Sequence, residues 1–232
     1  DEELLRLWLD IEVYTKTKLE RAYQAAWKQW KPDNMAPESG DLADSLARFL
    51  DAAGRYRHPF TQKLAQLALA IAEKAQGPEH PDTGTRLNNL ASLLLNMGDY
   101  AGAEPMFRRA LAIAEKTLGA EHPVTGEYLN NLGLLMHEKG EYSNAEIIFR
   151  NALLIAEKNE VAELINTGVR LYNLANTLRQ KGDYVAAEPL FRRSLAIIEK
   201  CQGAEHPKTG TALRGLGNLL KDRGNYAAAE PL

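Results

Sequence analysis

The sequence has little of several features that would assign it to a specialised class of protein. Its one cysteine, Cys201, cannot form an internal disulfide. No apolar run approaches the ~20 residues that span a bilayer, and the acidic start DEELLRLWLD lacks the basic region of a signal peptide. With 28 basic and 31 acidic residues, the net charge of -3 provides no bulk attraction to nucleic acid or to an anionic membrane. These absences predict a cytoplasmic protein whose partners are neither nucleic acid nor membrane.

What the sequence does contain is an internal repeat with a period of 42 residues. The stretch 97–116 recurs at 181–200, and a weaker copy lies at 139–158. Glycines and tyrosines mark the same positions in successive copies: Gly98, Gly140, Gly182 and Gly224, and Tyr100, Tyr142, Tyr184 and Tyr226. A period of this length indicates a solenoid in which each unit packs on the next. The chain opens without Met and stops inside a copy, which suggests a fragment of a longer protein.

Each unit is predicted to contain two helices joined by a tight turn. The first helix is expected over Pro81–Met97, where leucines follow helical spacing. Gly98 can adopt the positive φ that ends a helix, and Asp99 is a candidate N-cap for the second helix. Pro105, early in that second helix, predicts a late helix start or a slight kink. The apolar stripes are expected to comprise Leu87, Leu90, Ala91 and Leu94 in the first helix and Ala103, Phe107, Ala110, Leu111 and Ala114 in the second.

The junctions between helix pairs share a second pattern, GPEHPDTG, GAEHPVTG and GAEHPKTG. Glycine ends one helix and His-Pro begins the next. The variant junction at 161–168 lacks the leading Gly and the His-Pro but keeps its length, so we expect the same turn with different chemistry or a longer second helix. On the second helices an acid stands four residues before a base, as in Glu104 and Arg108, which predicts ion pairs on a solvated face.

Taken together, these markers resemble tetratricopeptide repeats (TPRs). The leucine-rich first helix, the Gly-x-Tyr turn and the following Ala and Phe stand at the offsets of that family, and LNNL, AEPLFRRSLAI and GAEHP are similar to the repeats of kinesin light chains. The resemblance implies an all-α superhelix of antiparallel helix pairs, a TPR solenoid, with an inner groove that holds partner peptides or proteins. It predicts an N-terminal helical segment and linker over 1–40, a degenerate first repeat over 41–82, repeats over 83–124, 125–166 and 167–208, and a truncated repeat over 209–232.

The N-terminal part departs from the repeat. The first 30 residues hold all the tryptophans, Trp8, Trp27 and Trp30. Three interpretations remain open: a helical cap on the first apolar face of the array, the tail of an upstream domain, or a helix that docks a partner. A linker is expected over 31–41. The degenerate repeat that follows has its first helix predicted over Leu42–Ala53, with Gly54 and Tyr56 two residues out of register.

The resemblance places partner-binding residues on the first helices, which line the groove in this family. Asn89, Asn131 and Asn173 share one repeat position, and by resemblance asparagine at that position holds a peptide backbone, to which an amide offers two donors and an acceptor. The alternative is that some of these asparagines bond neighbouring helices. The candidate partner-binding residues are Asn89, Asn131, Asn173, Asn88, Asn130, Asn96, Asn176, Arg179, Arg214 and Lys221.

Basic residues of the last two repeats add a second hypothesis. If Arg170, Arg179, Arg214 and Lys221 share the groove, they would hold an acidic peptide through charge-assisted hydrogen bonds. The alternative is a scatter of solvated bases. The carboxylate clamp of the family also needs lysines one turn before the asparagines, and those positions hold Thr85, Glu127, Val169 and Thr211. The clamp is therefore incomplete, which disfavours the C-terminal tails of chaperones as ligands.

No constellation of catalytic residues emerges from the sequence. Asp82-Thr83-Gly84 spells the triplet of aspartic proteases, but the other repeats replace the Asp. The recurring histidines, His80, His122 and His206, are spread along the array, whereas a zinc site needs converging ligands. We therefore predict a scaffold that binds a protein or peptide, without enzymatic activity, cofactor or metal. The alternative is the sensor or regulatory portion of a larger signalling ATPase or protease.

Overall fold

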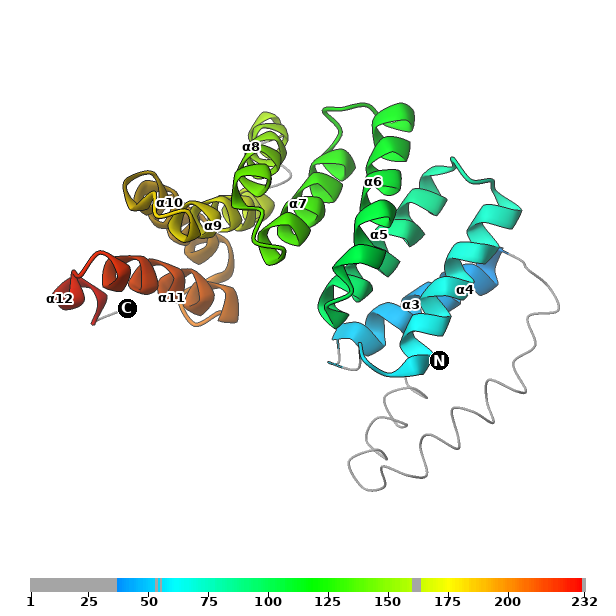
Figure 1. Cartoon of the computed structure of the whole chain (residues 1–232), viewed down its shortest axis with the longest axis horizontal. Helices are drawn as coiled ribbons and strands as arrows, with labels where there is room; N and C mark the ends of the chain where they lie inside the picture. Colours follow the sequence, from blue (N-terminus) through cyan, green and yellow to red (C-terminus); the bar gives the residue numbers. More distant parts are fainter. Residues whose placement is uncertain (1–36, 53, 55, 160–163, 231–232) are drawn as a thin grey trace, which may run out of the picture. The chain divides into compact units, whose positions relative to one another are not determined.

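The structure, a computed structural model, describes residues 37–52, 54, 56–159 and 164–230. Throughout these residues the regular structure is helical, which confirms the predicted all-α class (Figure 1). The helices are α3 (Pro37–Ala52), α4 (Pro59–Ala75), α5 (Pro81–Met97), α6 (Tyr100–Thr117), α7 (Pro123–Glu138), α8 (Tyr142–Lys158), α9 (Leu164–Gln180), α10 (Tyr184–Gln202), α11 (Pro207–Asp222) and α12 (Tyr226–Ala229). The predicted tryptophan-bearing helices at 1–30 lie outside the described residues. None of the described helices combines the length and the apolar character that crossing a membrane requires.

The chain divides into two compact units, Asp1–Ala75 and Gln76–Leu232. In the first unit α3 packs on α4, and a Cβ added to Gly40 would lie 3.0 Å from Ile71 Cγ2. The α5–α6 pair of the second unit makes the same contact, with 3.2 Å between a Cβ at Gly84 and Ile113 Cγ2. The α3–α4 pair therefore packs as the α5–α6 pair does, with a longer connection between its helices, and its assignment as a degenerate first repeat stays a prediction. Its first helix begins at Pro37, so the end of the predicted linker is helical.

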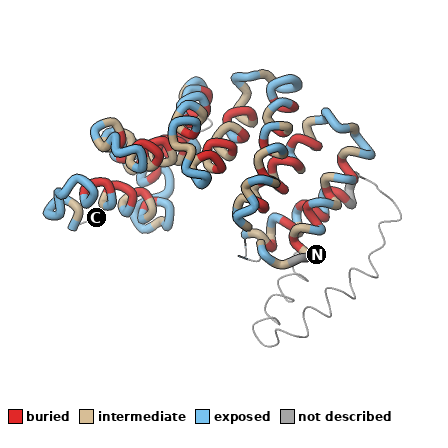
Figure 2. The backbone as a smooth tube through the Cα atoms, viewed as in Figure 1, coloured by how far each residue is buried: buried red, intermediate tan, exposed pale blue. Residues whose placement is uncertain are grey.

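In the second unit, first helices (α5, α7, α9, α11) alternate with second helices (α6, α8, α10), and each second helix packs against the first helices on either side of it. The core lies between these packed faces (Figure 2), and Phe107, Phe149 and Phe191 are completely buried there. Contrary to expectation, Leu111 is half-exposed and Ile113 takes its place in the core. Successive first helices also contact one another, as expected for the inner side of a curved stack.

The turn between α5 and α6 forms as its residues predict. Gly98 ends α5 with φ 83 and ψ 8, and the Asp99 side chain accepts a hydrogen bond from the Gly102 N–H at 3.0 Å. Because this cap defines where α6 starts, the helix begins at Tyr100 and contains Pro105 within its length. The expected late start is therefore wrong, since the proline removes one backbone donor without moving the helix start.

The junctions between pairs use histidine as a cap. His80 Nδ1 accepts a hydrogen bond from the Asp82 N–H at 3.2 Å, and His122 and His206 make the equivalent bonds to the residues two positions on. The Thr83 hydroxyl, from the protease-like triplet, donates to the Gly77 carbonyl at 2.7 Å and so closes the turn. At the variant junction α8 ends at Lys158, so the alternative of a longer second helix is wrong.

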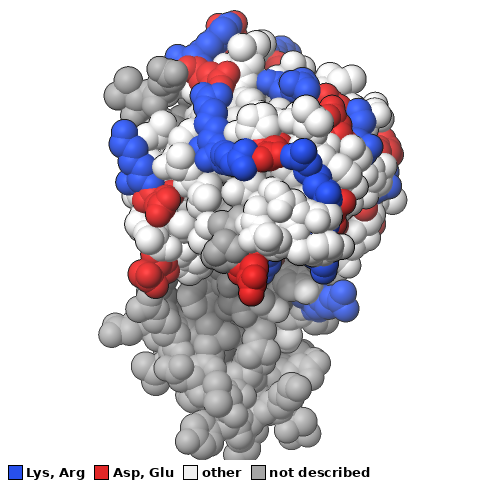
Figure 3. Space-filling model, turned by 90° about the vertical axis from the view of Figure 1, so that its left-hand side faces the viewer, with Lys and Arg blue, Asp and Glu red and all other residues white. Residues whose placement is uncertain are grey.

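Ion pairs connect successive repeats along the second helices. Glu104 and Arg108 form the predicted pair at 2.8 Å, and Glu104 also accepts a hydrogen bond from Lys139 of the next repeat at 2.8 Å. The hydrogen bond from Lys139, followed by the one from Arg108, lowers the pKa of Glu104. The arrangement recurs around Glu146 and Glu188. Basic and acidic residues are accordingly interspersed over the surface that Figure 3 shows.

Candidate partner-binding surface

Polar side chains of α5, α7 and α9 form a continuous network on the first helices. Most of them are half-exposed, so they combine a defined position with access to a partner. We call their surface the first-helix face and define it by Asn89, Asn130, Asn131, Asn173, Asn176 and Arg179.

Two equivalent hydrogen bonds join the asparagines of successive repeats. Asn131 Nδ2 donates to Asn88 Oδ1 at 3.0 Å, and Asn173 Nδ2 donates to Asn130 Oδ1 at 2.9 Å. Asn88 is only 4% exposed. For these four residues the structure shows the alternative, a bond to the neighbouring helix. The bonds also fix the orientation of the half-exposed Asn131 and Asn173, whose contact with a partner stays a prediction, as does that of the exposed Asn96.

The row of asparagines ends between α9 and α11. There Tyr172 takes the position of Asn88 and Asn130, and Gly215 takes that of Asn131 and Asn173. A Cβ added to Gly215 would lie 2.6 Å from Tyr172 Cε2, so the ring occupies the space of the missing side chain. Aligning the repeats reveals that Tyr172 and Gly215 correspond to Asn130 and Asn173, but their contact was not predicted.

The basic residues do not form one cluster. Arg170 is 3% exposed at the beginning of α9, whereas Arg179 stands nine residues later, about 14 Å along the helix. Arg179 Nη1 forms an ion pair with Asp222 Oδ2 of α11 at 2.6 Å. Arg214 and Lys221 of α11 are exposed. The four residues therefore occupy different environments, and a shared role in holding an acidic peptide stays a prediction.

A chain of polar contacts crosses three first helices. The Asn176 carboxamide of α9 lies 3.3 Å from His137 Nε2 of α7, and its Oδ1 accepts from Arg179 Nε at 3.4 Å and Nη2 at 3.2 Å. The Arg179–Asp222 ion pair continues the contacts to α11. We call His137, Asn176, Arg179 and Asp222 the polar chain. His137 and Asp222 could not be predicted from the sequence, because other repeats carry different residues at their positions.

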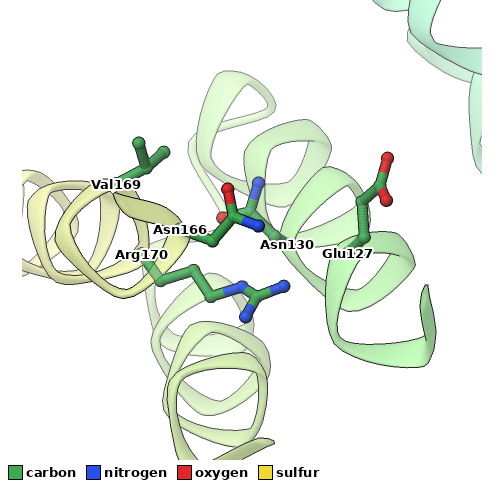
Figure 4. A pocket seen from close by; sticks show the side chains of 5 residues that line it. All are labelled: Glu127, Asn130, Asn166, Val169 and Arg170. Atoms are coloured by element: carbon green, nitrogen blue, oxygen red, sulfur yellow. The ribbon is translucent and has the colours of Figure 1, made fainter. Parts of the chain in front are cut away.

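A pocket of about 270 Å³ opens between α7 and α9 (Figure 4). Its lining combines a guanidinium, two carboxamides, a carboxylate and the methyl groups of a valine, from Glu127, Asn130, Asn166, Val169 and Arg170. One repeat earlier, Tyr128 stands at the position of Arg170, and its hydroxyl lies 3.2 Å from Thr85 Oγ1. Burial raises the pKa of Tyr128. The pocket thus adjoins the first-helix face and offers it further polar groups.

Two further features concern the remaining surface. The second helices expose apolar side chains at Ile147, Leu154 and Val185, which are 61%, 54% and 78% exposed. In the described part of the chain, no group of His, Cys, Asp and Glu side chains is placed to hold a metal ion. The polar groups of the first helices are arranged for hydrogen bonding. Within the protease-like triplet, the Thr83 hydroxyl donates to the Gly77 carbonyl of the turn.

Comparison with known proteins agrees with this architecture. A family model described as Tetratricopeptide repeat matches residues 43–116, 86–158 and 169–232. Nearly identical TPR-like repeats from Podosopora anserina, assigned to a kinesin light chain, are 22% identical with a TM-score of 0.69, over 84% of this chain and 92% of that chain. BtubC (BKLC) from P. vanneervenii is 23% identical with a TM-score of 0.65, over 82% and 76% of the two chains.

Another solved structure with a similar fold has a lower sequence identity. Aspartyl phosphate phosphatase F from Bacillus subtilis is 16% identical with a TM-score of 0.63, over 84% of this chain and 52% of that chain. At these identities the likeness concerns the fold. Comparison with curated proteins gave no match. Because the family model covers most of the sequence and the helix pairs have the predicted arrangement, the chain belongs to the tetratricopeptide repeat family.

Proposed function

We propose that the first-helix face binds an extended segment of a partner protein. The observation that carries this proposal is the pair of equivalent hydrogen bonds that hold Asn131 and Asn173 in the same orientation in successive repeats. Each of these bonds uses one N–H of the donating carboxamide, which has a second N–H and an oxygen with two lone pairs, one of which in Asn131 accepts from Asn130 Nδ2 at 3.5 Å. Both side chains are half-exposed. They are therefore oriented before a partner arrives, which reduces the entropy lost on binding.

The spacing of the repeats suits an extended chain. Packed helices lie about 8–10 Å apart, and an extended polypeptide rises about 3.3 Å per residue. Carboxamides one repeat apart therefore match peptide groups about three residues apart in the partner. Such contacts to the backbone would give affinity, while the pocket that contains Arg170 lies beside the same face and would contact side chains.

The experiment that tests this proposal compares matched sets of substitutions. A phage-displayed library of random linear peptides is selected on the wild-type chain. Binding of the selected peptides is then measured with the combined variant Asn89→Ala, Asn131→Ala and Asn173→Ala. The matched control is Ile147→Ala, Leu154→Ala and Val185→Ala, which changes exposed side chains of the second helices. We expect the first set to abolish binding and the control to retain it.

A further control separates direct contact from loss of geometry. Asn88→Ala breaks the same inter-repeat bond as Asn131→Ala but removes a side chain that is 4% exposed. If Asn131 contacts the partner, Asn131→Ala weakens binding more than Asn88→Ala does at similar thermal stability. Undiminished binding by the triple asparagine variant would refute the proposal. If the chain is the sensor portion of a larger signalling protein, the same face would bind another domain of that protein.

A further inference from the structure

The polar chain determines the protonation state of His137. A guanidinium has only N–H donors, so the Asn176 atom that faces Arg179 must be Oδ1. The Nδ2 group of Asn176 therefore faces His137, at 3.3 Å from Nε2. Because Nδ2 can only donate, Nε2 must accept, and it carries no proton.

Thr177 determines the protonation of the other ring nitrogen, Nδ1. The Thr177 hydroxyl donates to the Asn173 carbonyl at 2.9 Å, and its oxygen lies 3.0 Å from His137 Nδ1. With its proton committed to that carbonyl, the hydroxyl oxygen accepts from Nδ1–H. His137 is thus a neutral imidazole with its proton on Nδ1, and both ring nitrogens have suitable partners.

Adding a proton to Nε2 breaks this arrangement. Two donors, Nε2–H and the Asn176 Nδ2 group, would then face each other. Rotating the Asn176 carboxamide would not help, because Nδ2 would then face the donors of Arg179. No orientation of Asn176 can form hydrogen bonds with both the protonated His137 ring and Arg179. Protonation therefore requires Asn176 to leave one of these two partners.

The surrounding groups shift the pKa of His137 in both directions. Burial lowers the pKa of His137 from its ordinary value of 6.5, Glu138 on its own helix opposes that change, and the Arg179 cation of α9 adds to it. The Tyr142 ring at the start of α8 lies edge-on at 5.2 Å and brings no charge. From α11, Asp222 pairs with Arg179. Neither α5 nor α6, both described completely, contributes a charge to this shift.

We propose that protonation of His137 releases Asn176 from one of its two neighbours in the polar chain, His137 or Arg179, and thereby weakens partner binding at the first-helix face in acid. This inference rests on the proposed function, because Asn176 and Arg179 belong to that face. His137 acts as a positioning residue. If the partner binds the neutral form, its affinity falls by up to about tenfold per pH unit below the midpoint of the free protein.

The first test needs no partner. Nuclear magnetic resonance of the full chain follows the His137 ring, the Asn176 carboxamide and the Arg179 Nε–H between about pH 8 and about pH 5. We expect the Nδ1–H tautomer at neutral pH and a common midpoint for all three groups. An Asn176 carboxamide that does not respond at the His137 midpoint would overturn the inference, whatever the outcome for the proposed function.

The second test uses a peptide from the selection described above. Wild type is expected to bind it progressively more weakly as the pH falls below the His137 midpoint that the first test measures. His137→Gln keeps an acceptor for Asn176 but does not titrate, so its affinity should lose most of this dependence. His122→Gln removes a junction histidine and should keep the wild-type dependence. A pH dependence that persists in His137→Gln would contradict the inference, whereas failure to select any peptide would count against the proposed function alone.

Discussion

The hydrogen bond between Asn88 and Asn131 makes a quantitative prediction. Asn131 Nδ2 donates to Asn88 Oδ1 at 3.0 Å, and Asn88 is 4% exposed. Truncating either residue leaves a polar partner without this bond, which costs about 1–3 kcal/mol when the remaining group is buried. We expect Asn88→Ala to destabilise the chain by about 1 kcal/mol, because the remaining Asn131 is half-exposed, and Asn131→Ala by about 2 kcal/mol, because the remaining Asn88 is buried.

The double variant isolates the bond itself. Because both single variants lose the same interaction, the double variant should cost less than the sum, by about 0.5–1.5 kcal/mol. Urea unfolding followed by circular dichroism measures these free energies. The matched control combines Asn88→Ala with Asn173→Ala, which stand two repeats apart and should be additive to within about 0.5 kcal/mol. Additivity in the Asn88–Asn131 pair as well would refute the claim that this bond couples α5 to α7.

Three further predictions follow from the packing and the ion pairs. Phe149→Ala removes a ring that is completely buried and should cost about 3–5 kcal/mol in urea unfolding. Gly215→Asn places a Cβ 2.6 Å from Tyr172 Cε2 and should destabilise by about 1–3 kcal/mol, with partial recovery when Tyr172→Asn recreates the pair of the preceding repeats, as measured by thermal unfolding. The pKa of Glu104 lies below its ordinary value of 4.5. The ionised carboxylate therefore contributes to the free energy of unfolding above about pH 4.5, and this contribution is lost as the pH falls through the lower pKa of the folded state. Lys139→Met should reduce that acid-side loss of thermal stability.

The fold could be predicted because its determinants are local and repeat. Gly98 and Asp99 define a turn within two residues, and the same pair recurs two periods later at Gly182 and Asp183. The sequence predicted that His-Pro begins the helix after each junction, and the hydrogen bond that the Asp82 N–H donates to His80 Nδ1 confirms it. The late start predicted from Pro105 was wrong because a proline rule considers one residue, while the cap at Asp99 decides where the helix begins.

The contacts of the candidate surface could be predicted only in part. Repeat alignment placed Asn88 and Asn131 one position apart within successive units, but their bond depends on the rotation between neighbouring helices, which a period does not specify. Both interpretations of the asparagines therefore remained open from sequence. The His137–Asn176 contact had no sequence signal, because it joins positions that vary from one repeat to the next.

The central claim is that a partner binds at the first helices, and site-specific photo-crosslinking tests it most directly. A photoreactive amino acid is placed at Asn89, half-exposed on α5, or at Leu154, 54% exposed on α8, and a peptide from the selection is added. We predict a crosslink to the peptide from position 89, suppressed by excess unlabelled peptide, and none from position 154. A crosslink from position 154 alone would contradict the account and assign binding to the second helices.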